Sequence, residues 1–155
     1  MRTITLLAFG VALVAPGSLR AQVILPPADS LLQELVRRTV AVMEEDATPA
    51  DVDQLVGLYH ANGVHDRVLA GFAGPTHLPL SRDSLRTHWL GRLGHTRAPE
   101  VEVTRLAGDR QVVMAEIAFT FEIRTERGWG RVFWSRVLVV EVGCGKIMRV
   151  VDYRS

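Results

Sequence analysis

The sequence predicts an α+β domain in which helices come first and an antiparallel sheet follows. Three observations indicate this class. Apolar residues recur at helical spacing in the first half of the chain, the period changes to two after Glu100, and short turn-like separators divide the second half. Segments joined by such short turns pair as antiparallel hairpins, so helices packed on one face of a sheet are the expected architecture.

The composition favours one folded domain without a nucleic-acid partner. The chain has 155 residues, of which 48% are hydrophobic and 23% are charged. This balance is ordinary for a globular domain, and the length suffices to bury one core. The formal net charge is +1, with the two signs interspersed. Because no strongly basic region is present to bind phosphates, we expect no nucleic-acid partner.

The first residues have the layout of a secretory signal peptide. Arg2 gives a positive start, residues 4–14 form an almost unbroken apolar run, and small residues follow. We expect cleavage after Gly17 or Ala21, and hence export to the periplasm or the extracellular medium. The alternative is a membrane anchor, but the run is too short to span a bilayer comfortably, and no later stretch is apolar enough.

This interpretation divides the chain into three parts. Residues 1–21 are the predicted signal peptide, residues 22–28 a short linker and residues 29–155 the folded domain. The single cysteine, Cys144, lies in a predicted hairpin turn, so no internal disulfide can form and packing must hold the domain together. No histidine or helix start lies nearby in the sequence to activate its thiol, and we interpret Cys144 as an ordinary turn residue.

Two helices are expected before residue 64. The first follows Asp29-Ser30, because Pro26-Pro27 prevent an earlier start. Its apolar stripe consists of Leu31, Leu32, Leu35, Val36, Val40 and Met43. The second begins at Thr48-Pro49, where Thr48 can cap the helix and Pro49 suits its first turn. Asn62-Gly63 favours left-handed conformations and is expected to end this helix.

A third helix is expected over residues 81–93, after a short strand at residues 64–69 and a loop rich in glycine and proline. Ser81 can cap this helix, and Gly94 is expected to terminate it. Four longer strands follow, over residues 101–106, 111–125, 131–142 and 146–153. One face of the second of these is expected to carry Val113, Ala115, Ile117, Phe119, Phe121 and Ile123.

Three features in this order resemble the SnoaL-like, nuclear-transport-factor-2-like superfamily. They are the segment LVGLYHANGVHD at residues 55–66, the helix after the glycine-rich loop, and the ending GKIMRVVDY at residues 145–153. The resemblance implies a cone-shaped, cystatin-like fold, in which three N-terminal helices pack in the concave face of a curved antiparallel sheet around an apolar pocket. Members include polyketide cyclases, limonene-epoxide-hydrolase-like and steroid-isomerase-like enzymes, and noncatalytic binding or assembly domains.

Asp152 is the first candidate for catalysis. It shares a strand face with apolar residues, and burial there would raise the pKa of its carboxyl and make it a usable base. The resemblance implies a catalytic Asp at this position in epoxide-hydrolase-like members. Those members also carry an Arg-x-Asp pair on a central strand, where this chain is expected to have Glu116 and Ala118, so epoxide hydrolysis is disfavoured. A salt bridge from Asp152 to Arg149 or Arg154 is the alternative role.

His65 and Asp66 are the second candidates. The resemblance places their short strand near the pocket mouth, where either side chain can transfer a proton. Such a base is expected to work with a hydrogen-bond donor, for which Tyr59 and Tyr153 are the candidates. The alternative is that His65 and Asp66 form a polar rim beside a turn.

Aromatic side chains are candidates for the pocket wall, although core packing accounts for most such residues. The four selected are Tyr59, Trp89, Phe119 and Trp134. Trp129 is expected at a hairpin tip, where it would contact a ligand, a neighbouring subunit or a crossing segment. The five histidines show no metal-binding spacing, and no phosphate-binding or dinucleotide-binding glycine motif is present. We therefore expect no metal and no cofactor.

These observations predict an exported domain whose apolar pocket binds a small hydrophobic molecule. If the domain is an enzyme, the expected chemistry is metal-free acid/base catalysis of the isomerase, cyclase or hydrolase type. Asp152 would then be the base or acid, with Asp66, His65 and Tyr153 in support. The alternative is a noncatalytic ligand-binding or protein-assembly module on the same fold. The second face of the sheet mixes apolar and charged residues, which is compatible with a homodimer.

Overall fold

The computed structural model describes residues 27–70 and 74–154, so the predicted signal peptide lies outside the described residues. Within them the chain forms three helices and six strands. The first five elements are α1 (Pro27–Met43), α2 (Pro49–Val56), β1 (Tyr59–Leu69), β2 (Thr76–Ser81) and α3 (Arg82–Leu90). The remaining four are β3 (Thr96–Gly108), β4 (Val112–Thr125), β5 (Gly128–Gly143) and β6 (Lys146–Arg154).

The strands form one mixed sheet in the order β2-β1-β6-β5-β4-β3. Strand β6 runs antiparallel to β5 but parallel to β1. The predicted α+β class is confirmed, whereas the prediction of a wholly antiparallel sheet is wrong. Short turns determine direction only between consecutive strands, and no such turn connects β1 to β6. Strands β1 and β2 also precede α3, so only two of the helices come before the first strand.

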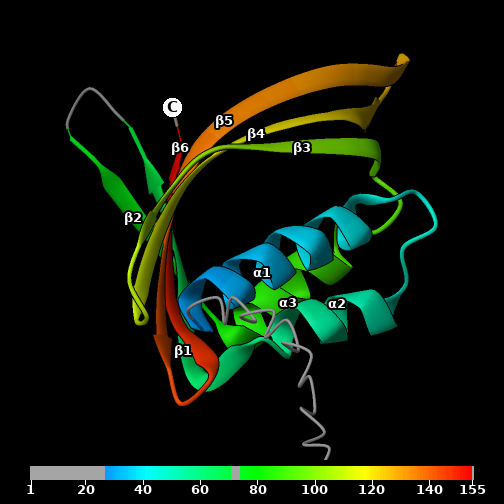
Figure 1. Ribbon diagram of the computed structural model, residues 1–155. Coiled ribbons are helices and arrows are strands. Elements are labelled where there is room, and N and C mark those ends of the chain that lie inside the picture. Colours follow the sequence, from blue (N-terminus) through cyan, green and yellow to red (C-terminus); the bar gives the residue numbers. More distant parts are fainter. Residues whose placement is uncertain (1–26, 71–73, 155) are drawn as a thin grey trace, which may run out of the picture.

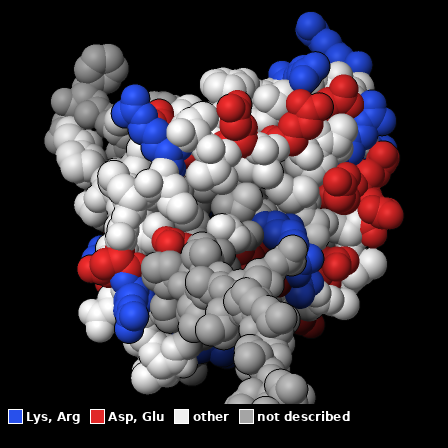
Figure 2. Space-filling view, viewed as in Figure 1, with Lys and Arg blue, Asp and Glu red and all other residues white. Residues whose placement is uncertain are grey.

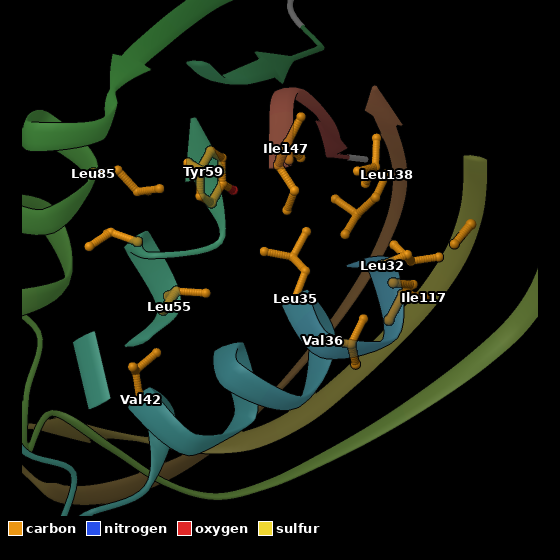
Figure 3. Packing of buried hydrophobic residues seen from close by; sticks show 14 of the residues in the cluster. Leu32, Leu35, Val36, Val42, Leu55, Tyr59, Leu85, Ile117, Leu138 and Ile147 are labelled. Carbon is orange, nitrogen blue, oxygen red and sulfur yellow. The ribbon is translucent and has the colours of Figure 1, made fainter. Parts of the chain in front are cut away.

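The sheet is strongly curved, and the helices lie on the inner side of the bend (Figure 1). The predicted alternation of β4 is confirmed, because Val113, Ala115, Ile117, Phe119 and Phe121 are all buried, and their shared face is the inward one. These side chains join residues of α1, α2 and α3 in one hydrophobic core, part of which is drawn in Figure 3. Burial of this apolar surface is the main driving force that holds the helices against the sheet.

The predicted starts of α2 and α3 are confirmed by their capping contacts, whereas α1 begins at Pro27, before the predicted start at Asp29-Ser30, because proline suits the first turn of a helix. At the start of α2, the backbone amide and the hydroxyl of Thr48 donate hydrogen bonds to Asp51 Oδ2, at 2.9 and 2.6 Å. At the start of α3, Ser81 Oγ accepts a hydrogen bond from the backbone amide of Ser84, at 3.2 Å. Both contacts satisfy polar groups that a helix end would otherwise leave unpaired.

The predicted helix ends are wrong by several residues. Helix α2 ends at Val56, and Asn62-Gly63, which was expected to terminate it, lies inside β1. Helix α3 ends at Leu90 and is followed by Gly91 rather than continuing toward Gly94. In both places the chain leaves the helix early, because the following residues pair in the sheet or form a turn. Such tertiary pairing overrides local preference.

On the face drawn in Figure 2, basic and acidic side chains lie side by side. On the outer sheet face, three large apolar side chains are more than two fifths exposed, namely Met114, Phe133 and Tyr153. A homodimer through this face stays a prediction. Of the helices formed by the described residues, none combines the length and the apolar character that a membrane span requires.

Candidate functional site

A pocket lies between the helices and the inner face of the sheet. Its apolar wall consists of Leu35, Val36, Leu55, Leu80, Leu85, Trp89, Phe119 and Leu138. Its polar wall consists of Thr39, Tyr59, His65, Arg67, His88, Arg136 and Arg154. The cavity volume is about 30 Å³, within about 540 Å³ of free space that includes the open mouth. The unliganded cavity therefore accommodates only one or two water molecules, and a larger ligand must displace side chains.

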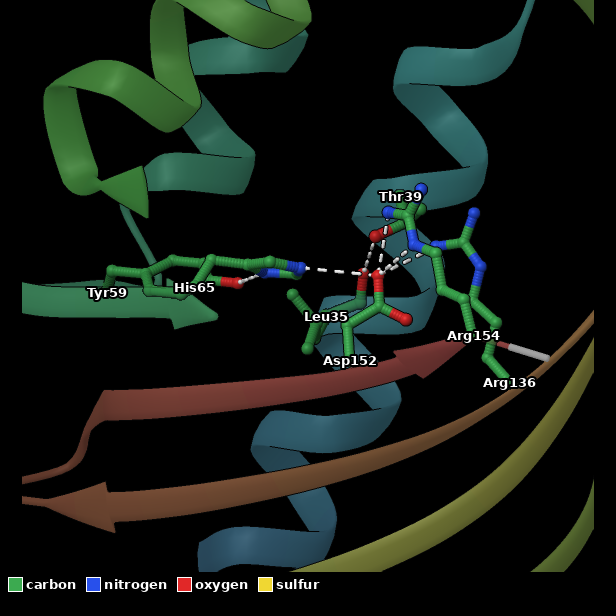
Figure 4. Close-up of polar contacts among 7 residues, drawn as sticks. All are labelled: Leu35, Thr39, Tyr59, His65, Arg136, Asp152 and Arg154. Atoms are coloured by element: carbon green, nitrogen blue, oxygen red, sulfur yellow. Dashed lines mark hydrogen bonds and ion pairs between the residues drawn. The ribbon is translucent and has the colours of Figure 1, made fainter. Parts of the chain in front are cut away.

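Asp152 lies at the polar side of this pocket and is completely buried. Its Oδ2 accepts two hydrogen bonds from Arg154, one from Nη2 at 2.7 Å and one from Nε at 2.9 Å (Figure 4). Arg136 Nη1 donates a third, longer hydrogen bond at 3.4 Å. Of the salt bridges considered as the alternative role of Asp152, the one to Arg154 is present, whereas Arg149 pairs with Asp66 instead.

The pKa of Asp152 differs from the sequence-based expectation. Desolvation is the largest single effect and raises the pKa, as expected for a buried carboxyl. The hydrogen bond to His65 and the charges of Arg136 and Arg154 together outweigh it and lower the pKa to about 2. Asp152 is therefore an anion at neutral pH. The expectation of a raised pKa is wrong, because it took no account of the two arginines.

Tyr59, His65 and Asp152 form a chain of polar contacts along the pocket wall (Figure 4). The Tyr59 hydroxyl lies 2.8 Å from His65 Nδ1, and His65 Nε2 lies 3.6 Å from Asp152 Oδ2. Burial, followed by the charge of Asp152, raises the pKa of Tyr59, so the phenol keeps its proton and donates a hydrogen bond to Nδ1. A neutral His65 then carries its proton on Nε2, which faces the Asp152 carboxylate.

An irregularity in β1 makes the contact between Tyr59 and His65 possible. Tyr59 pairs with Ile147 and Val64 with Arg149, so β1 uses five residues where β6 advances by two. In a regular strand, residues six apart would be separated by roughly 20 Å. Here the two rings lie 6.2 Å apart between centroids. Gly63 fits within this segment because a Cβ there would lie 2.9 Å from the carbonyl oxygen of Ile147.

Among the predicted aromatic wall residues, Tyr59, Trp89 and Phe119 line the pocket. Trp134 lies beside it, with its ring 4.6 Å from that of Phe121 and 4.6 Å from the Arg136 guanidinium. Tyr59, Phe119 and Trp134 therefore belong to the sheet, whereas Trp89 reaches the pocket from α3. The rings of Phe119 and Trp134 also stack on the Arg136 guanidinium and help to hold this cation in place.

Two of the four predicted catalytic residues lie on the opposite face of the sheet. Asp66 points away from the pocket, and its Oδ2 contacts His77 Nδ1 at 2.9 Å and Arg149 Nη2 at 3.2 Å. Tyr153 is 45% exposed on the same outer face. Strand alternation explains this outcome, because Asp66 and Tyr153 are direct sequence neighbours of the inward-facing His65 and Asp152. The structure brings His65 and Asp152 together and leaves Asp66 and Tyr153 apart from them.

Glu116 and Ala118, which were expected at the position of the Arg-x-Asp pair, do not face the pocket. Glu116 and Ala118 alternate with the buried Ile117 and so lie on the outer face of β4. The arginine that reaches Asp152 is Arg136 on β5, and two residues further along the inner face stands Leu138. The inner face at this point therefore offers one carboxylate and not two.

Sequence reasoning missed the cationic character of the pocket. Arg67, Arg136 and Arg154 line it from three adjacent strands, β1, β5 and β6. The alternation of inward and outward residues along each strand could have identified them. Arg136 alternates in step with Trp134 and Leu138, so it occupies an inward position of β5.

The remaining polar candidates of the sequence have local explanations. The Arg97 guanidinium lies 4.4 Å from the centre of the Trp129 ring, so a crossing segment of the same chain covers this tryptophan. Cys144 is exposed in the turn between β5 and β6. Across residues 27–70 and 74–154, no three His, Cys, Asp or Glu side chains are grouped as metal ligands would be.

Comparisons by sequence find no match, either to a family model or to a curated protein. Comparisons by structure find many. An LEH-like epoxide hydrolase of Mycobacterium tuberculosis is 21% identical, covering 79% of this chain and 84% of its own, with a TM-score of 0.54. A protein of ketosteroid isomerase-like fold from Catenulispora acidiphila, solved in complex with trimethylamine, is 15% identical. The match covers 79% of this chain and 85% of that protein, with a TM-score of 0.56.

A third similar structure is a computationally designed 17-OHP binder. It is 13% identical, covers 84% of this chain and 92% of its own, and has a TM-score of 0.58. At these identities the likeness concerns the fold, and a fold of this kind hosts many unrelated activities. The helices, the mixed curved sheet and these neighbours agree with the resemblance noted in the sequence. The chain has the SnoaL-like, nuclear-transport-factor-2-like fold.

Proposed function

We propose that this protein binds a small, largely apolar molecule in the pocket and transfers protons to or from it without a metal. One observation carries the proposal, namely the continuous chain of contacts from Tyr59 through His65 to Asp152 at the pocket wall. Tyr59 and His65 both line the cavity, so the chain meets the space that a ligand would occupy. Clusters of buried titratable groups that open on a cavity are typical of active sites.

The chain of contacts acts as a proton relay. In the basic direction, a ligand proton passes to the Tyr59 oxygen while the tyrosine proton moves to His65 Nδ1, and the resulting imidazolium faces the Asp152 carboxylate. In the acidic direction the same protons move back, and the Tyr59 hydroxyl protonates a ligand oxygen. Asp152 orients the imidazole and stabilises its charge without taking up a proton itself. This role suits the lowered pKa of Asp152.

The remaining walls favour a ligand with an apolar body. Leu35 comes from α1, Leu55 from α2 and Phe119 from β4. All three line the pocket and are buried in the same core. Their convergence on one cavity is the usual construction of a small-molecule site. The expectation of a small hydrophobic ligand is kept as part of the proposal.

A noncatalytic binding module is the second candidate, and the pairing of Asp152 favours it. Two hydrogen bonds from Arg154 and one from Arg136 hold this carboxylate as a structural ion pair would. A designed binder on the same fold is consistent with a pocket that binds without turnover. The two candidates differ in whether removal of the relay abolishes turnover or leaves binding as the only activity.

Native mass spectrometry of the protein, purified gently from an exporting host, identifies any retained small molecule. Turnover of that molecule is then compared among wild type, Tyr59→Phe, His65→Gln and the matched control His77→Gln. The control removes a histidine that also contacts a buried aspartate, but on the outer face of the sheet. We expect Tyr59→Phe and His65→Gln to lose turnover by about 10²-fold or more, and His77→Gln to stay close to wild type.

Two results would contradict the catalytic proposal. Equal turnover by wild type and His65→Gln excludes the relay. A retained molecule that binds wild type and both pocket variants but is never converted supports the binding module instead. Chemical shift changes on ligand addition locate the site independently, and we expect them on β1, β5 and β6.

Export is proposed on the sequence alone. The apolar run at residues 4–14 and the small residues after it carry this proposal. N-terminal sequencing of the protein recovered from an exporting bacterium tests it. We expect the mature chain to begin at Ser18 or Gln22, and recovery of the protein with Met1 intact in the membrane fraction would favour an anchor.

A further inference from the structure

Positive charge exceeds negative charge inside the pocket. The guanidinium groups of Arg67, Arg136 and Arg154 line it, whereas Asp152 is the one carboxylate that they meet among the described residues. Arg154 directs both its Nε and its Nη2 at Asp152 and thereby uses most of the acceptor capacity of Oδ2. Two of the three pocket cations are left without full compensation.

The same arginines carry unpaired hydrogen-bond donors. The Nε atoms of Arg67 and Arg136 are buried and have no hydrogen-bond partner among the described residues. The guanidinium of Arg67 has no ion pair with any described side chain, and that of Arg136 has only the 3.4 Å contact to Asp152. Buried donors of this kind are normally satisfied by water or by a ligand. Both atoms belong to residues that line the cavity.

The charged forms of Arg67 and Arg136 are disfavoured in this cluster of cations. The pKa of Arg136 is lowered to about 10, chiefly by burial; Asp152 opposes this effect, and the charges of Arg154, Arg92 and Arg67 add to it. The pKa of Arg67 is lowered by burial and by Arg154. A cluster of buried cations whose protonated forms are disfavoured is expected at a site where an anion binds, because the anion restores the balance of charge.

From this geometry we infer that the pocket ligand is a small organic carboxylate. The inference rests on the proposed function and specifies its substrate class. The carboxylate lies against Arg67 and Arg136, whose free N–H groups donate to its oxygens, and the apolar body extends along the leucine and aromatic wall. Paired N–H groups of a guanidinium match a carboxylate in geometry as well as in charge.

This placement also orients the ligand toward the proposed relay. Figure 4 shows Arg136 and Arg154 on one side of Asp152, with Tyr59 and His65 on the other. A carboxylate anchored at the arginines therefore points the remainder of the ligand toward the Tyr59 hydroxyl. The arginines fix the position of the ligand, and the relay of Tyr59 and His65 acts on a second functional group of the same ligand. The two sets of residues therefore have separate roles.

Benzoate and benzamide provide a matched pair of probes, because they share shape and size and differ in charge. We would titrate each into the isotope-labelled protein, purified from cells that express the full chain, and follow the backbone amide shifts. We expect benzoate to bind at least about tenfold more tightly than benzamide, since a charge-assisted hydrogen bond contributes that much. The largest shifts are expected on β1, β5 and β6, close to Arg67, Arg136 and Arg154.

Arg67→Met tests the anchor directly, and Arg105→Met is its control. Arg105 lies on β3 outside the pocket, with its side chain 86% exposed. We expect Arg67→Met to weaken benzoate binding at least about tenfold and benzamide binding by less than about twofold, and the control to change neither. Arg92→Met is a second variant that lowers the local charge without touching the pocket lining, should Arg67→Met fail to fold. We expect it to weaken benzoate binding more than benzamide binding.

Three outcomes would overturn the inference. The first is equal affinity for benzoate and benzamide, the second is an undiminished preference for benzoate in Arg67→Met, and the third is the absence of pocket shifts from both probes at millimolar concentrations. Equal affinity with pocket shifts leaves the proposed small-molecule site intact and removes only the carboxylate. Loss of turnover in His65→Gln is measured separately, so failure of the relay and failure of the anion site can be distinguished.

Discussion

Replacing Asp152 with asparagine removes the one carboxylate that meets the pocket arginines and keeps nearly the same shape. The pKa of the folded carboxyl is about 2, compared with 3.8 for an ordinary Asp. Each pKa unit corresponds to about 1.4 kcal/mol, so the ionised form contributes about 2 kcal/mol to the free energy of unfolding at pH 7. Removing one partner of a buried ion pair costs up to about 5 kcal/mol, because the other charges stay behind. We therefore expect Asp152→Asn to lose between about 2 and 5 kcal/mol.

The pH dependence gives this prediction its sharpest form. A carboxyl with a lowered pKa in the folded state stabilises the protein above the unfolded value of 3.8, and the contribution is lost as the pH falls toward 2. The part of the difference that comes from ionisation should therefore fall to about half between pH 7 and pH 3. Urea unfolding of wild type and Asp152→Asn at several pH values measures it. An asparagine variant as stable as wild type at pH 7 would refute the ion-pair argument, as would a difference that does not change at pH 3.

Three further predictions concern single positions. The pKa of His88 is lowered to about 4, first by burial and then by neighbouring arginines, so the stability of the wild type should fall as the pH drops from about 6.5 to 4. We expect this pH dependence to amount to about 1–2 kcal/mol after allowance for solvent screening, and to be absent from His88→Gln when both proteins are unfolded in urea. Gly63→Ala places a methyl group 2.9 Å from a β6 carbonyl oxygen, and we expect a loss of about 1–3 kcal/mol together with altered side-chain resonances of Tyr59 and His65. Gly108→Ala places its methyl 2.4 Å from the Val112 carbonyl oxygen and should lower the melting temperature, whereas Gly130→Ala, with 3.7 Å to its nearest neighbour, should leave it nearly unchanged.

Local patterns in the sequence predict much of the fold. The cap at Thr48, the period of two in β4 and the glycine turns between the last strands all appear where expected. Each depends on residues within a few positions of one another, which is the range over which propensity and alternation act. The length of β1 and the existence of β2 depend on pairing with partners elsewhere in the chain. Asn62-Gly63 accordingly looked like the end of a helix and forms part of a strand.

The site was predictable only in outline. Asp152 and His65 were identified from their strands, but the contact between Tyr59 and His65 depends on the irregularity in β1, for which the sequence carries no plain signal. The outward positions of Asp66 and Tyr153 depend on strand phase, which a shift of one residue reverses. The lowered pKa of Asp152 required the positions of Arg136 and Arg154. Charge interactions across strands are set by tertiary register, and so appear only once the sheet is assembled.

The place of β6 in the sheet has a consequence for folding kinetics. This strand follows all the other described strands in the sequence, yet it lies between β1 and β5 and joins the β1–β2 hairpin to the meander of β3, β4 and β5. Its parallel pairing with β1 connects Val64 with Arg149, so a long loop must close before the two halves meet. Contacts of such high sequence separation slow folding. Until β6 docks, the edges of β1 and β5 stay open to pairing with other chains, and Asp152 and Arg154 are absent from the pocket. Conversion of the collapsed chain into a binding-competent protein is therefore expected to coincide with the slowest step of folding.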